Sequence, residues 1–368
     1  MTQSSPCVEE NLLFQKRGQV QHVIINRPSA LNALNLSMIR DLTAKLKDCV
    51  HDPRTSVITI RGAGGKAFCA GGDLKSLTYS VKDGSNYGQQ FFFEEFTLNY
   101  IIGTFPKPLI SIMNGITFGG AAGLTVVGRF NVATDQSVFC MPECAIGLFP
   151  DVGSGYFLSR LPGNFGMFLG LTGHRLRGHE IVRAGLASHY IEHSQIPHLD
   201  SILETLQPPV SVDDINALLH EFQDMSAASI PESCTLEQHR EQIARCFSGD
   251  SVEEIVSNLE HDRSPWALAQ LSAIKKMSPT SLKITFRLLK EGLNKNLAET
   301  LKTEYRLTQR CVADKDFHEG IRATILDKDH KPRWSPDNLK DVTAEKVDYY
   351  FSPLSQGQEL DLQCTWMK

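Results

Sequence analysis

The sequence predicts an α/β fold with a mostly helical C-terminal region, and three observations support this class. Short β-branched runs alternate with helical patterns through the first half of the 368-residue chain. Two glycine-rich segments follow predicted strands, an arrangement typical of parallel βα units. After about Pro208 the chain becomes more charged, poorer in glycine and helical in its pattern. We therefore divide the chain into an α/β core, residues 11–205, and a helical region, residues 206–368.

The first predicted elements are a strand, a helix and two further strands. Residues 22–28 form a β-branched run that ends at Arg27-Pro28. Residues 35–50 predict a helix with Asn35 or Ser37 as its N-cap. Its apolar face consists of Met38, Ile39, Leu42, Leu46 and Cys49. Residues 56–62 and 107–115 predict the next two strands, so parallel βα units are expected.

The later elements follow from the same patterns. Residues 114–128 run from a strand end into small and apolar residues, which predicts a buried helix. Residues 129–134 and 138–143 predict two short strands, and residues 166–191 a helical segment that closes the core. In the second region, Ser278-Pro279 supplies an N-cap and a first-turn proline for a helix that Gly292 ends.

The composition favours a soluble globular protein and gives no sign of nucleic-acid or membrane binding. The chain is 41% hydrophobic and 21% charged, with a net charge of −5 and no basic block. No run of about 18 apolar residues is present, so no membrane span is expected. The nine cysteines are scattered and include no C-x-x-C pair, which favours reduced, buried thiols.

Several common catalytic motifs are excluded by single residues. Lys66 in the first glycine-rich segment is followed by Ala67, whereas a Walker loop needs Ser or Thr there. The dinucleotide fingerprint fails because its third glycine would also fall on Ala67. Ser154 lacks the flanking glycines of a nucleophile elbow. The histidines form no H-E-x-x-H motif, so neither a Ser–His triad nor a zinc site is supported.

Two carboxylates, Glu143 and Asp151, stand in the apolar, glycine-rich stretch 141–157. They are separated by Gly and Pro, so they cannot share a helix face, but a loop that folds back would bring both to one cavity. Apolar surroundings raise a carboxyl pKa and so make it useful as a base or proton donor. The alternative is that one or both are capping or turn residues.

The two glycine-rich turns suggest a second chemical feature. Each turn allows a close approach of backbone N–H groups to a ligand oxygen. Two such turns would aim one N–H each at the same carbonyl and form an oxyanion hole built from backbone alone. Close packing between layers is the alternative role for these glycines.

Three ordered stretches resemble the enoyl-CoA hydratase/isomerase (crotonase) superfamily: residues 66–74 (KAFCAGGDL), 114–124 (NGITFGGAAGL) and 141–153 (MPECAIGLFPDVG). The resemblance covers about residues 11–335. It implies a spiral of ββα units with a helical C-terminal region that completes the cover of the site. It also implies that the N–H groups of Gly72 and Gly120 hold the thioester carbonyl of an acyl-CoA. CoA is then part of the substrate and product, and no cofactor or metal is expected.

The departures from the hydratase pattern narrow the expected reaction. Gly123 stands where hydratases carry one glutamate, Glu143 matches their other glutamate, and Asp151 replaces a glycine. This pattern is similar to the branch of the family that hydrolyses 3-hydroxyisobutyryl-CoA, as are residues 276–285, 316–329 and 331–334. Within that branch, Glu95 matches a substrate-binding acid.

The resemblance therefore implies hydrolysis of 3-hydroxyisobutyryl-CoA to 3-hydroxyisobutyrate and CoA, a step of valine breakdown. Glu143 is the expected nucleophile or general base, and Asp151 its catalytic partner. Three alternatives stay open: an enoyl-CoA hydratase or isomerase, a hydrolase of another short acyl-CoA, and a non-catalytic RNA-binding or scaffold protein of the same fold. The missing acid at Gly123 argues against hydration, and the retained acids argue against the non-catalytic alternative.

The expected partner is a small-molecule acyl-CoA, and nothing in the sequence predicts an oligomeric state. The family implies the mitochondrial matrix as the location. The N-terminal stretch MTQSSPCVEEN lacks the Arg-rich pattern of a transit peptide and the apolar core of a secretory signal. The sequence thus predicts either a cytosolic protein or one whose leader is missing here, and the family favours the second.

Overall fold

The computed structural model describes residues 10–77 and 86–362 and contains two sheets side by side. The six-stranded sheet has the order β1-β2-β3-β5-β7-β10, and the four-stranded sheet the order β4-β6-β8-β9. The strands are β1 (Leu12–Arg17), β2 (Val20–Ile25), β3 (Val57–Gly62), β4 (Ala67–Cys69), β5 (Leu109–Ile112), β6 (Ile116–Phe118), β7 (Phe130–Ala133), β8 (Val138–Cys140), β9 (Leu176–Arg177) and β10 (His189–Tyr190).

Most neighbouring strands run parallel, as the alternation of strands and helices predicts. Among the strands of residues 10–77 and 86–362, only the edge pairs β1–β2 and β8–β9 are antiparallel. In the larger sheet, Val20 pairs with Val57 and Ile58 with Leu109, and these residues are fully or almost fully buried. Continuous apolar strands of this kind need cover on both faces, which suits a parallel sheet between layers of helices.

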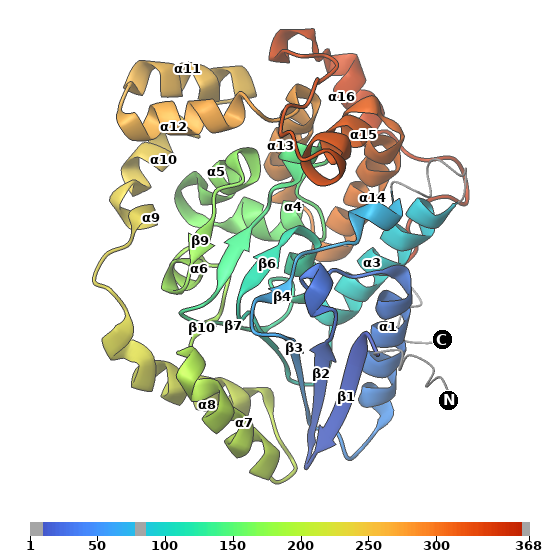
Figure 1. Ribbon diagram of the computed structural model, residues 1–368, viewed down its shortest axis with the longest axis vertical. Helices are drawn as coiled ribbons and strands as arrows, with labels where there is room; N and C mark the ends of the chain where they lie inside the picture. The colour runs from blue at the N-terminus through green and yellow to red at the C-terminus, as the bar shows by residue number, and fades with distance from the viewer. Residues whose placement is uncertain (1–9, 78–85, 363–368) are drawn as a thin grey trace, which may run out of the picture.

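The helices lie around and above these sheets. They are α1 (Leu36–His51), α3 (Tyr87–Gly103), α4 (Ser154–Phe157), α5 (Phe165–Thr172), α6 (His179–Arg183), α7 (Ile196–Thr205), α8 (Val212–Ser226), α9 (Thr235–Gln238), α10 (Arg240–Cys246), α11 (Val252–Asp262), α12 (Pro265–Ile274), α13 (Pro279–Gly292), α14 (Leu297–Ala313), α15 (Lys315–Ile321) and α16 (Ala344–Phe351). Figure 1 shows α1 and α3 beside the larger sheet, α7 and α8 at its lower end, and α11–α16 above the sheets.

The predicted helix caps are found in both parts of the chain, at the starts of α1 and α13. Asn35 caps α1 by accepting a hydrogen bond from the N–H of Met38 at 3.0 Å. Ser278 caps α13, with Pro279 in the first turn, and the helix ends at Gly292. These caps satisfy backbone N–H groups that would otherwise lack partners inside a helix.

Two predicted helical segments differ from the structure. The segment 114–128 contains β6 and a short 3₁₀ helix, η2 (Gly119–Leu124), rather than a long buried helix. Residues 166–191 were expected to be helical but contain α5, β9, α6 and β10. Gly173, Gly178 and Gly185 have φ values of 62°, 52° and 88°, and each ends or interrupts the helical pattern.

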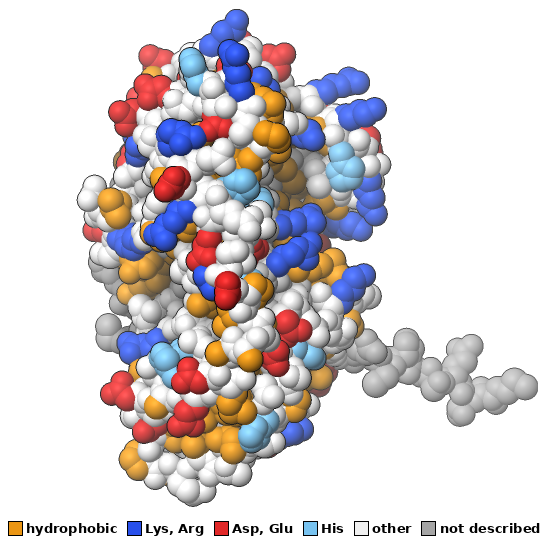
Figure 2. Space-filling view, turned by 90° about the vertical axis from the view of Figure 1, so that its left-hand side faces the viewer, with side chains coloured by type: hydrophobic (Ala, Val, Ile, Leu, Met, Phe, Trp, Pro, Cys, Tyr) orange, Lys and Arg blue, Asp and Glu red, His pale blue; other side chains and the backbone are white. Residues whose placement is uncertain are grey.

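No described residue beyond Tyr190 belongs to a strand, so the C-terminal part described here consists of helices and loops. The division of the chain at residues 205 and 206 stays a prediction. The largest hydrophobic cluster includes residues from Leu12 to Leu362, so helices from the second part pack against the sheets. The face shown in Figure 2 mixes basic and acidic side chains, with several Lys and Arg gathered at its upper right edge.

Candidate active site

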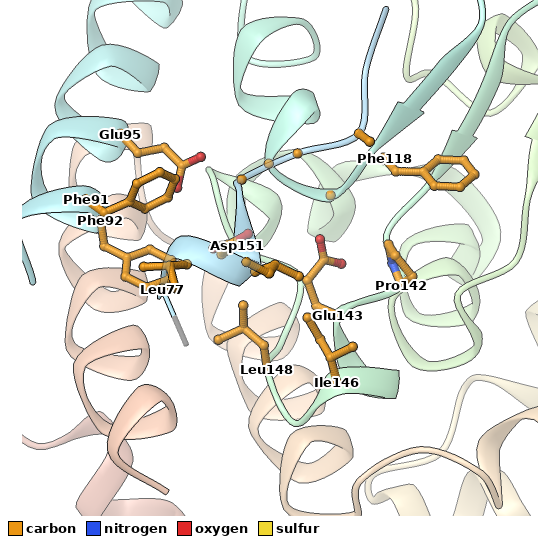
Figure 3. A pocket seen from close by; sticks show the side chains of 16 residues that line it. Leu77, Phe91, Phe92, Glu95, Phe118, Pro142, Glu143, Ile146, Leu148 and Asp151 are labelled. Atoms are coloured by element: carbon orange, nitrogen blue, oxygen red, sulfur yellow. The ribbon is translucent and has the colours of Figure 1, made fainter. Parts of the chain in front are cut away.

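A pocket of about 110 Å³ lies between the turn that follows β4 (residues 70–72), the helices η2 and α3, and the segment 142–151. All five residues singled out from the sequence line it: Gly72, Gly120, Glu95, Glu143 and Asp151. Figure 3 shows Glu95 and Glu143 on opposite sides of the pocket, with the backbone of the glycine-rich turn between them. The structure thus brings together residues that are far apart in the sequence.

The two candidate oxyanion donors are adjacent in space. Gly72 forms an isolated parallel bridge with Leu34, in which Gly71 O accepts from Leu34 N and Asp73 N donates to Leu34 O. Neither hydrogen bond of this bridge uses the Gly72 N–H, which leaves it available to a ligand oxygen. A methyl group added to Gly120 would lie only 3.3 Å from Gly72 N.

A side chain at either turn would crowd the pocket. A Cβ on Gly72 would lie 2.9 Å from the Phe91 ring, and one on Gly120 would lie 2.9 Å from Glu95 Oε1. Gly120 is also the second residue of η2, where an N–H group has no acceptor inside the helix. Close backbone approach, which the sequence predicts, is therefore what these glycines permit.

Glu95 reaches the pocket from the middle of α3. Its side chain is 2% exposed, and its Oε1 atom has no hydrogen-bond partner among the described residues. Burial, followed by the charge of Asp151, holds the pKa of Glu95 well above its usual range. A buried, unpartnered carboxyl oxygen beside the candidate oxyanion donors is placed to bind a polar group of a ligand.

Glu143 begins the 3₁₀ helix η3 (Glu143–Ile146), directly after Pro142. The helix ends at Gly147, whose φ of 72° favours glycine, and a Cβ there would lie 2.3 Å from the backbone of Asp316. Helix α15 therefore holds η3 in place. Glu143 is 4% exposed, its Oε2 has no hydrogen-bond partner within the described chain, and its Oε1 lies against Gly119.

Asp151 follows Pro150 at the end of a loop that folds back from η3. The next two residues, Val152 and Gly153, have φ values of 53° and 93°. Left-handed backbone at a β-branched residue is strained, so the surrounding contacts must hold this turn. The left-handed Gly147 at the end of η3 and the loop to Pro150 fold the chain back between the two acids, and Glu143 and Asp151 line one cavity, as the sequence predicts.

The electrostatics of the pocket are set by acids without basic partners. Burial raises the pKa of Asp151 to about 7. Burial, and then the charge of Asp151, holds the pKa of Glu143 well above its usual range. Within the described residues, none of the three carboxyls of Glu95, Glu143 and Asp151 forms an ion pair. Protons must therefore be shared among them near neutral pH.

The remaining walls of the pocket are apolar. Phe91 and Phe92 from α3 meet edge to face, with ring centroids 5.6 Å apart. Ile146 and Leu148 face them from the other side of the pocket (Figure 3). Apolar walls exclude water and strengthen the interactions of a bound carbonyl with backbone N–H groups.

Asn99 of α3 fills the space beside Gly123, the position at which hydratases carry a glutamate. Gly123 lies in η2, and a Cβ there would be 2.3 Å from Asn99 Nδ2 and 2.8 Å from Asn99 Oδ1. Asn99 lies one turn after Glu95 on α3 and is fully buried. An acidic side chain at position 123 would overlap the Asn99 carboxamide.

Sequence reasoning missed two buried polar residues near the pocket. Asn99 and Glu304 are both fully buried, and Glu304 hydrogen-bonds the turn that follows Asp151. In the sequence, both are single polar residues within helical patterns, where a solvent-facing position is the ordinary expectation. Their distance from the glycine-rich motifs along the chain left no local signal for a role at the site.

The described residues give no sign of a metal centre or a membrane span. Within residues 10–77 and 86–362, no three His, Cys, Asp or Glu side chains are grouped so that they could hold a metal ion. Over the same ranges, every helix is too short or too polar to cross a membrane. Cys69 and Cys140, which lie near the pocket, are free and buried, as the sequence predicts.

Comparisons with known proteins place the chain among CoA enzymes. Residues 20–351 match the family model described as enoyl-CoA hydratase/isomerase. The proteins named "3-hydroxyisobutyryl-CoA hydrolase, mitochondrial" from Rattus norvegicus and Homo sapiens are each 48% identical to this chain. The matches cover 93% and 95% of this chain, and 89% and 90% of those proteins.

Two solved structures share the fold over almost the whole chain. An enoyl-CoA hydratase from Rhodobacter sphaeroides 2.4.1 superposes with a TM-score of 0.85 and 35% identity, covering 96% of this chain and 100% of that chain. A carnitinyl-CoA dehydratase from Mycobacterium thermoresistibile superposes with a TM-score of 0.85 and 32% identity, and the match covers 96% of this chain and 99% of that chain. The predicted fold class is confirmed by these overlaps, which include the helical C-terminal region.

Proposed function

Because the chain belongs to the enoyl-CoA hydratase/isomerase family, we propose that it hydrolyses the thioester of 3-hydroxyisobutyryl-CoA to 3-hydroxyisobutyrate and CoA. The observation that carries this function is the 48% identity to hydrolases of that name over 93% of the chain. The pocket supports it, because backbone donors and buried acids meet there without any ion pair within the described residues.

In this function, the thioester carbonyl binds between Gly72 and Gly120. Attack on the carbonyl carbon moves charge onto its oxygen, and the two N–H groups stabilise that charge without having to reorganise. Each such donor contributes about 3–4 kcal/mol to transition-state stabilisation in acyl-transfer enzymes. The apolar walls formed by Phe91 and Phe92 keep water from weakening these hydrogen bonds.

Glu143 and Asp151 divide the proton transfers. In the reactive state the proton shared by the two acids lies on Asp151, and Glu143 is ionised. Glu143 then either attacks the carbonyl carbon, forming a mixed anhydride that water hydrolyses to the free acid, or removes a proton from a water that attacks the carbonyl directly. In both routes the C–S bond breaks and the sulfur leaves with the bonding electron pair. A protonated Asp151 then donates its proton to the leaving thiolate, which suits its pKa of about 7.

The substrate hydroxyl is bound by Glu95 in this proposal. The unpartnered Oε1 of Glu95 lies beside Gly120 and accepts the hydroxyl hydrogen bond of a 3-hydroxyacyl chain. A site built to hydrogen-bond a hydroxyl discriminates strongly against an acyl chain that lacks it, because the buried carboxyl is then left unpaired. This contact makes Glu95 a determinant of acyl-chain specificity.

Hydration of an enoyl-CoA is the second candidate function, favoured by the fold shared with an enoyl-CoA hydratase and a carnitinyl-CoA dehydratase. It needs acid–base groups that add water across a double bond, and a glutamate at position 123 is part of that pattern by family resemblance. Here the position is Gly123, and Asn99 occupies the adjacent space. The pocket therefore favours hydrolysis.

The test is to compare free-thiol release from 3-hydroxyisobutyryl-CoA with the absorbance change on crotonyl-CoA. Thiol release without hydration supports the hydrolase. Glu143→Gln and Asp151→Asn are each expected to lose at least about 10²-fold in kcat/KM. Glu94→Gln, next to Glu95 but paired with Arg40 on the surface, is the matched control. Full activity in both pocket variants contradicts the proposal.

The two routes for Glu143 are separated by rapid-quench mass spectrometry. An acyl adduct on the peptide that contains Glu143 during a single turnover assigns the mixed-anhydride route. An unmodified peptide throughout the turnover assigns general-base attack by water. Glu143→Asp is the useful comparison, because it keeps the carboxyl but withdraws it from the substrate carbon.

The proposed location is the mitochondrial matrix, where this reaction belongs to valine breakdown. The support is the word "mitochondrial" in the names of the similar hydrolases. Fractionation of cells that express the tagged full-length protein tests it. Recovery in the matrix fraction is expected, and recovery in the cytosol contradicts it.

A further inference from the structure

Glu304 is a buried acid that the proposed reaction does not use. It lies in the middle of α14 and is fully buried. Among the described residues it forms no ion pair, although a buried carboxylate usually needs one. Its burial therefore requires another set of partners, and these come from the turn that carries Asp151.

The carboxyl of Glu304 binds both sides of that turn. Its Oε2 accepts a hydrogen bond from Gly153 N at 2.6 Å, and its Oε1 accepts one from Gly155 N at 2.9 Å. The Ser154 hydroxyl lies 3.5 Å from the same Oε1 and donates to the carbonyl oxygen of Pro150. One side chain from a distant helix thus satisfies two backbone donors within three residues of each other.

The turn needs such a partner because its backbone is strained. Val152 and Gly153 are consecutive residues with positive φ. In this turn the N–H groups of Gly153 and Gly155, on either side of Ser154, reach the same concavity, whereas the Ser154 N–H bonds the Asp151 carbonyl oxygen. Side chains cannot fill the concavity, because a Cβ on Gly153 or Gly155 would lie 2.8 Å from Val127 or Leu288. The carboxyl of Glu304 occupies this concavity.

Asp151 stands immediately before the strained residues. Its carbonyl oxygen accepts a hydrogen bond from Ser154 N at 3.0 Å, so the same turn fixes its backbone. Its side chain lines the substrate pocket, whereas Glu304 is absent from the lining. The two carboxyls therefore reach the turn from different sides, one toward the substrate and one toward α14.

The charges of the two acids are coupled. Burial raises the pKa of Glu304 to about 8, the N–H groups of Gly155 and Gly153 lower it, and the charge of Asp151 raises it. Glu143 also feels the charge of Glu304. Because the pKa of Glu304, about 8, lies above that of Asp151, about 7, Asp151 ionises first, and its charge then helps to hold the proton on Glu304.

We propose that Glu304 is a positioning residue for Asp151: its two carboxyl oxygens accept the N–H groups of Gly153 and Gly155, and this clamp aims the Asp151 carboxyl at the leaving sulfur. This role rests on the proposed hydrolase function for its catalytic meaning. The clamp itself is a property of the free protein and does not depend on the substrate.

Glu304→Gln tests the clamp while preserving side-chain shape. The amide oxygen accepts from one glycine, but the amide nitrogen faces the other N–H, so one of the two hydrogen bonds is lost. We expect kcat for thiol release to fall about 10- to 100-fold through misplacement of Asp151, with KM changed less than about threefold. The limb of the pH profile that reports Asp151 is expected to stay near pH 7, because Glu304 is protonated there and the substitution removes no charge.

Thr308→Ala is the matched control on the same helix. Thr308 is fully buried one turn after Glu304, and its hydroxyl donates to the Tyr305 carbonyl instead of the turn. It is expected to lower thermal stability while keeping kcat close to wild type. If Glu304→Gln keeps wild-type kcat, or loses no more kcat than Thr308→Ala at a similar loss of thermal stability, the positioning role is wrong.

Amide hydrogen exchange separates this inference from the proposed function. In the free protein, the amides of Gly153 and Gly155 are expected to exchange faster in Glu304→Gln than in wild type or Thr308→Ala. If the wild type does not release thiol but this difference is seen, the hydrolase function fails and the clamp stands. If thiol is released but exchange is unchanged, the clamp fails and the function stands.

Discussion

Substitution of Gly120 by alanine is the sharpest test of the proposed oxyanion hole. The added methyl group would lie 2.9 Å from Glu95 Oε1, 3.3 Å from Gly72 N and 3.5 Å from Gly71 Cα. An oxyanion must sit about 2.7–3.1 Å from its N–H donors, so the methyl group takes the space that the oxygen needs. Gly120 does not have positive φ, and alanine therefore adds no backbone strain there.

The expected loss follows from one disabled donor. About 3–4 kcal/mol of transition-state stabilisation corresponds to a fall of about 10²–10³-fold in kcat. The assay is thiol release from 3-hydroxyisobutyryl-CoA, with thermal unfolding measured in parallel. Gly88→Ala is the control, because its methyl group would make ordinary contacts of 3.8 Å with Leu77 and Val312. A Gly120→Ala enzyme with kcat within about threefold of wild type refutes the oxyanion assignment.

Three further predictions concern charge and packing at the site. Asp151→Asn should stabilise the free protein above pH 7, because the pKa of Asp151 rises from 3.8 in the unfolded chain to about 7 in the folded protein, so its contribution to folding is complete below pH 3.8 and is lost as the pH rises to 7. The expected gain above pH 7 is up to about 4 kcal/mol of unfolding free energy. Urea unfolding at pH 5 and pH 8 measures it, and an equal effect of the substitution at both pH values contradicts the prediction. Wild-type kcat should fall as pH rises through about 7, because a protonated Asp151 donates to the thiolate; a flat pH–rate profile from pH 6 to 8 excludes that role. Gly123→Glu alone should destabilise the fold through overlap with Asn99 and should add no hydration of crotonyl-CoA. The double variant that also carries Asn99→Ala should recover thermal stability. Equal melting temperatures for the single and double variants would show that Asn99 does not fill this space.

The parts of the fold that depend on local pattern could be predicted from the sequence. The parallel strands are short apolar runs, and the caps at Asn35 and Ser278 bond N–H groups three residues away. Such signals involve neighbours along the chain, so they can be found without the tertiary structure. The prediction of a helical segment at residues 166–191 was wrong, because the apolar spacing does not show the backbone conformation of its glycines. Its apolar spacing suits a helix, but positive φ at its glycines breaks it into short helices and strands.

The candidate site divides in the same way. Gly72, Gly120, Glu143 and Asp151 belong to compact motifs, and the structure brings them into one pocket, although their catalytic roles stay predictions. The role of Glu304 could not be predicted from the sequence, because its hydrogen-bond partners, Gly153 and Gly155, lie about 150 positions earlier in the chain. A buried acid on an amphipathic helix has the same local pattern as an exposed one. Only the packing of α14 against the 153–155 turn distinguishes them.

The absence of an acid at Gly123 and the presence of one at Asp151 have a common electrostatic reason. Glu95, Glu143, Asp151 and Glu304 are already buried together with no ion pair among the described residues, and each raises the pKa of at least one other or is raised by it. A further glutamate in η2 would stay protonated at neutral pH, because each added buried charge costs more than the last. A neutral acid there could not act as a base. At position 151 the acid instead faces the pocket from the turn that Glu304 and the glycine N–H groups hold, and its raised pKa of about 7 suits it as the proton donor.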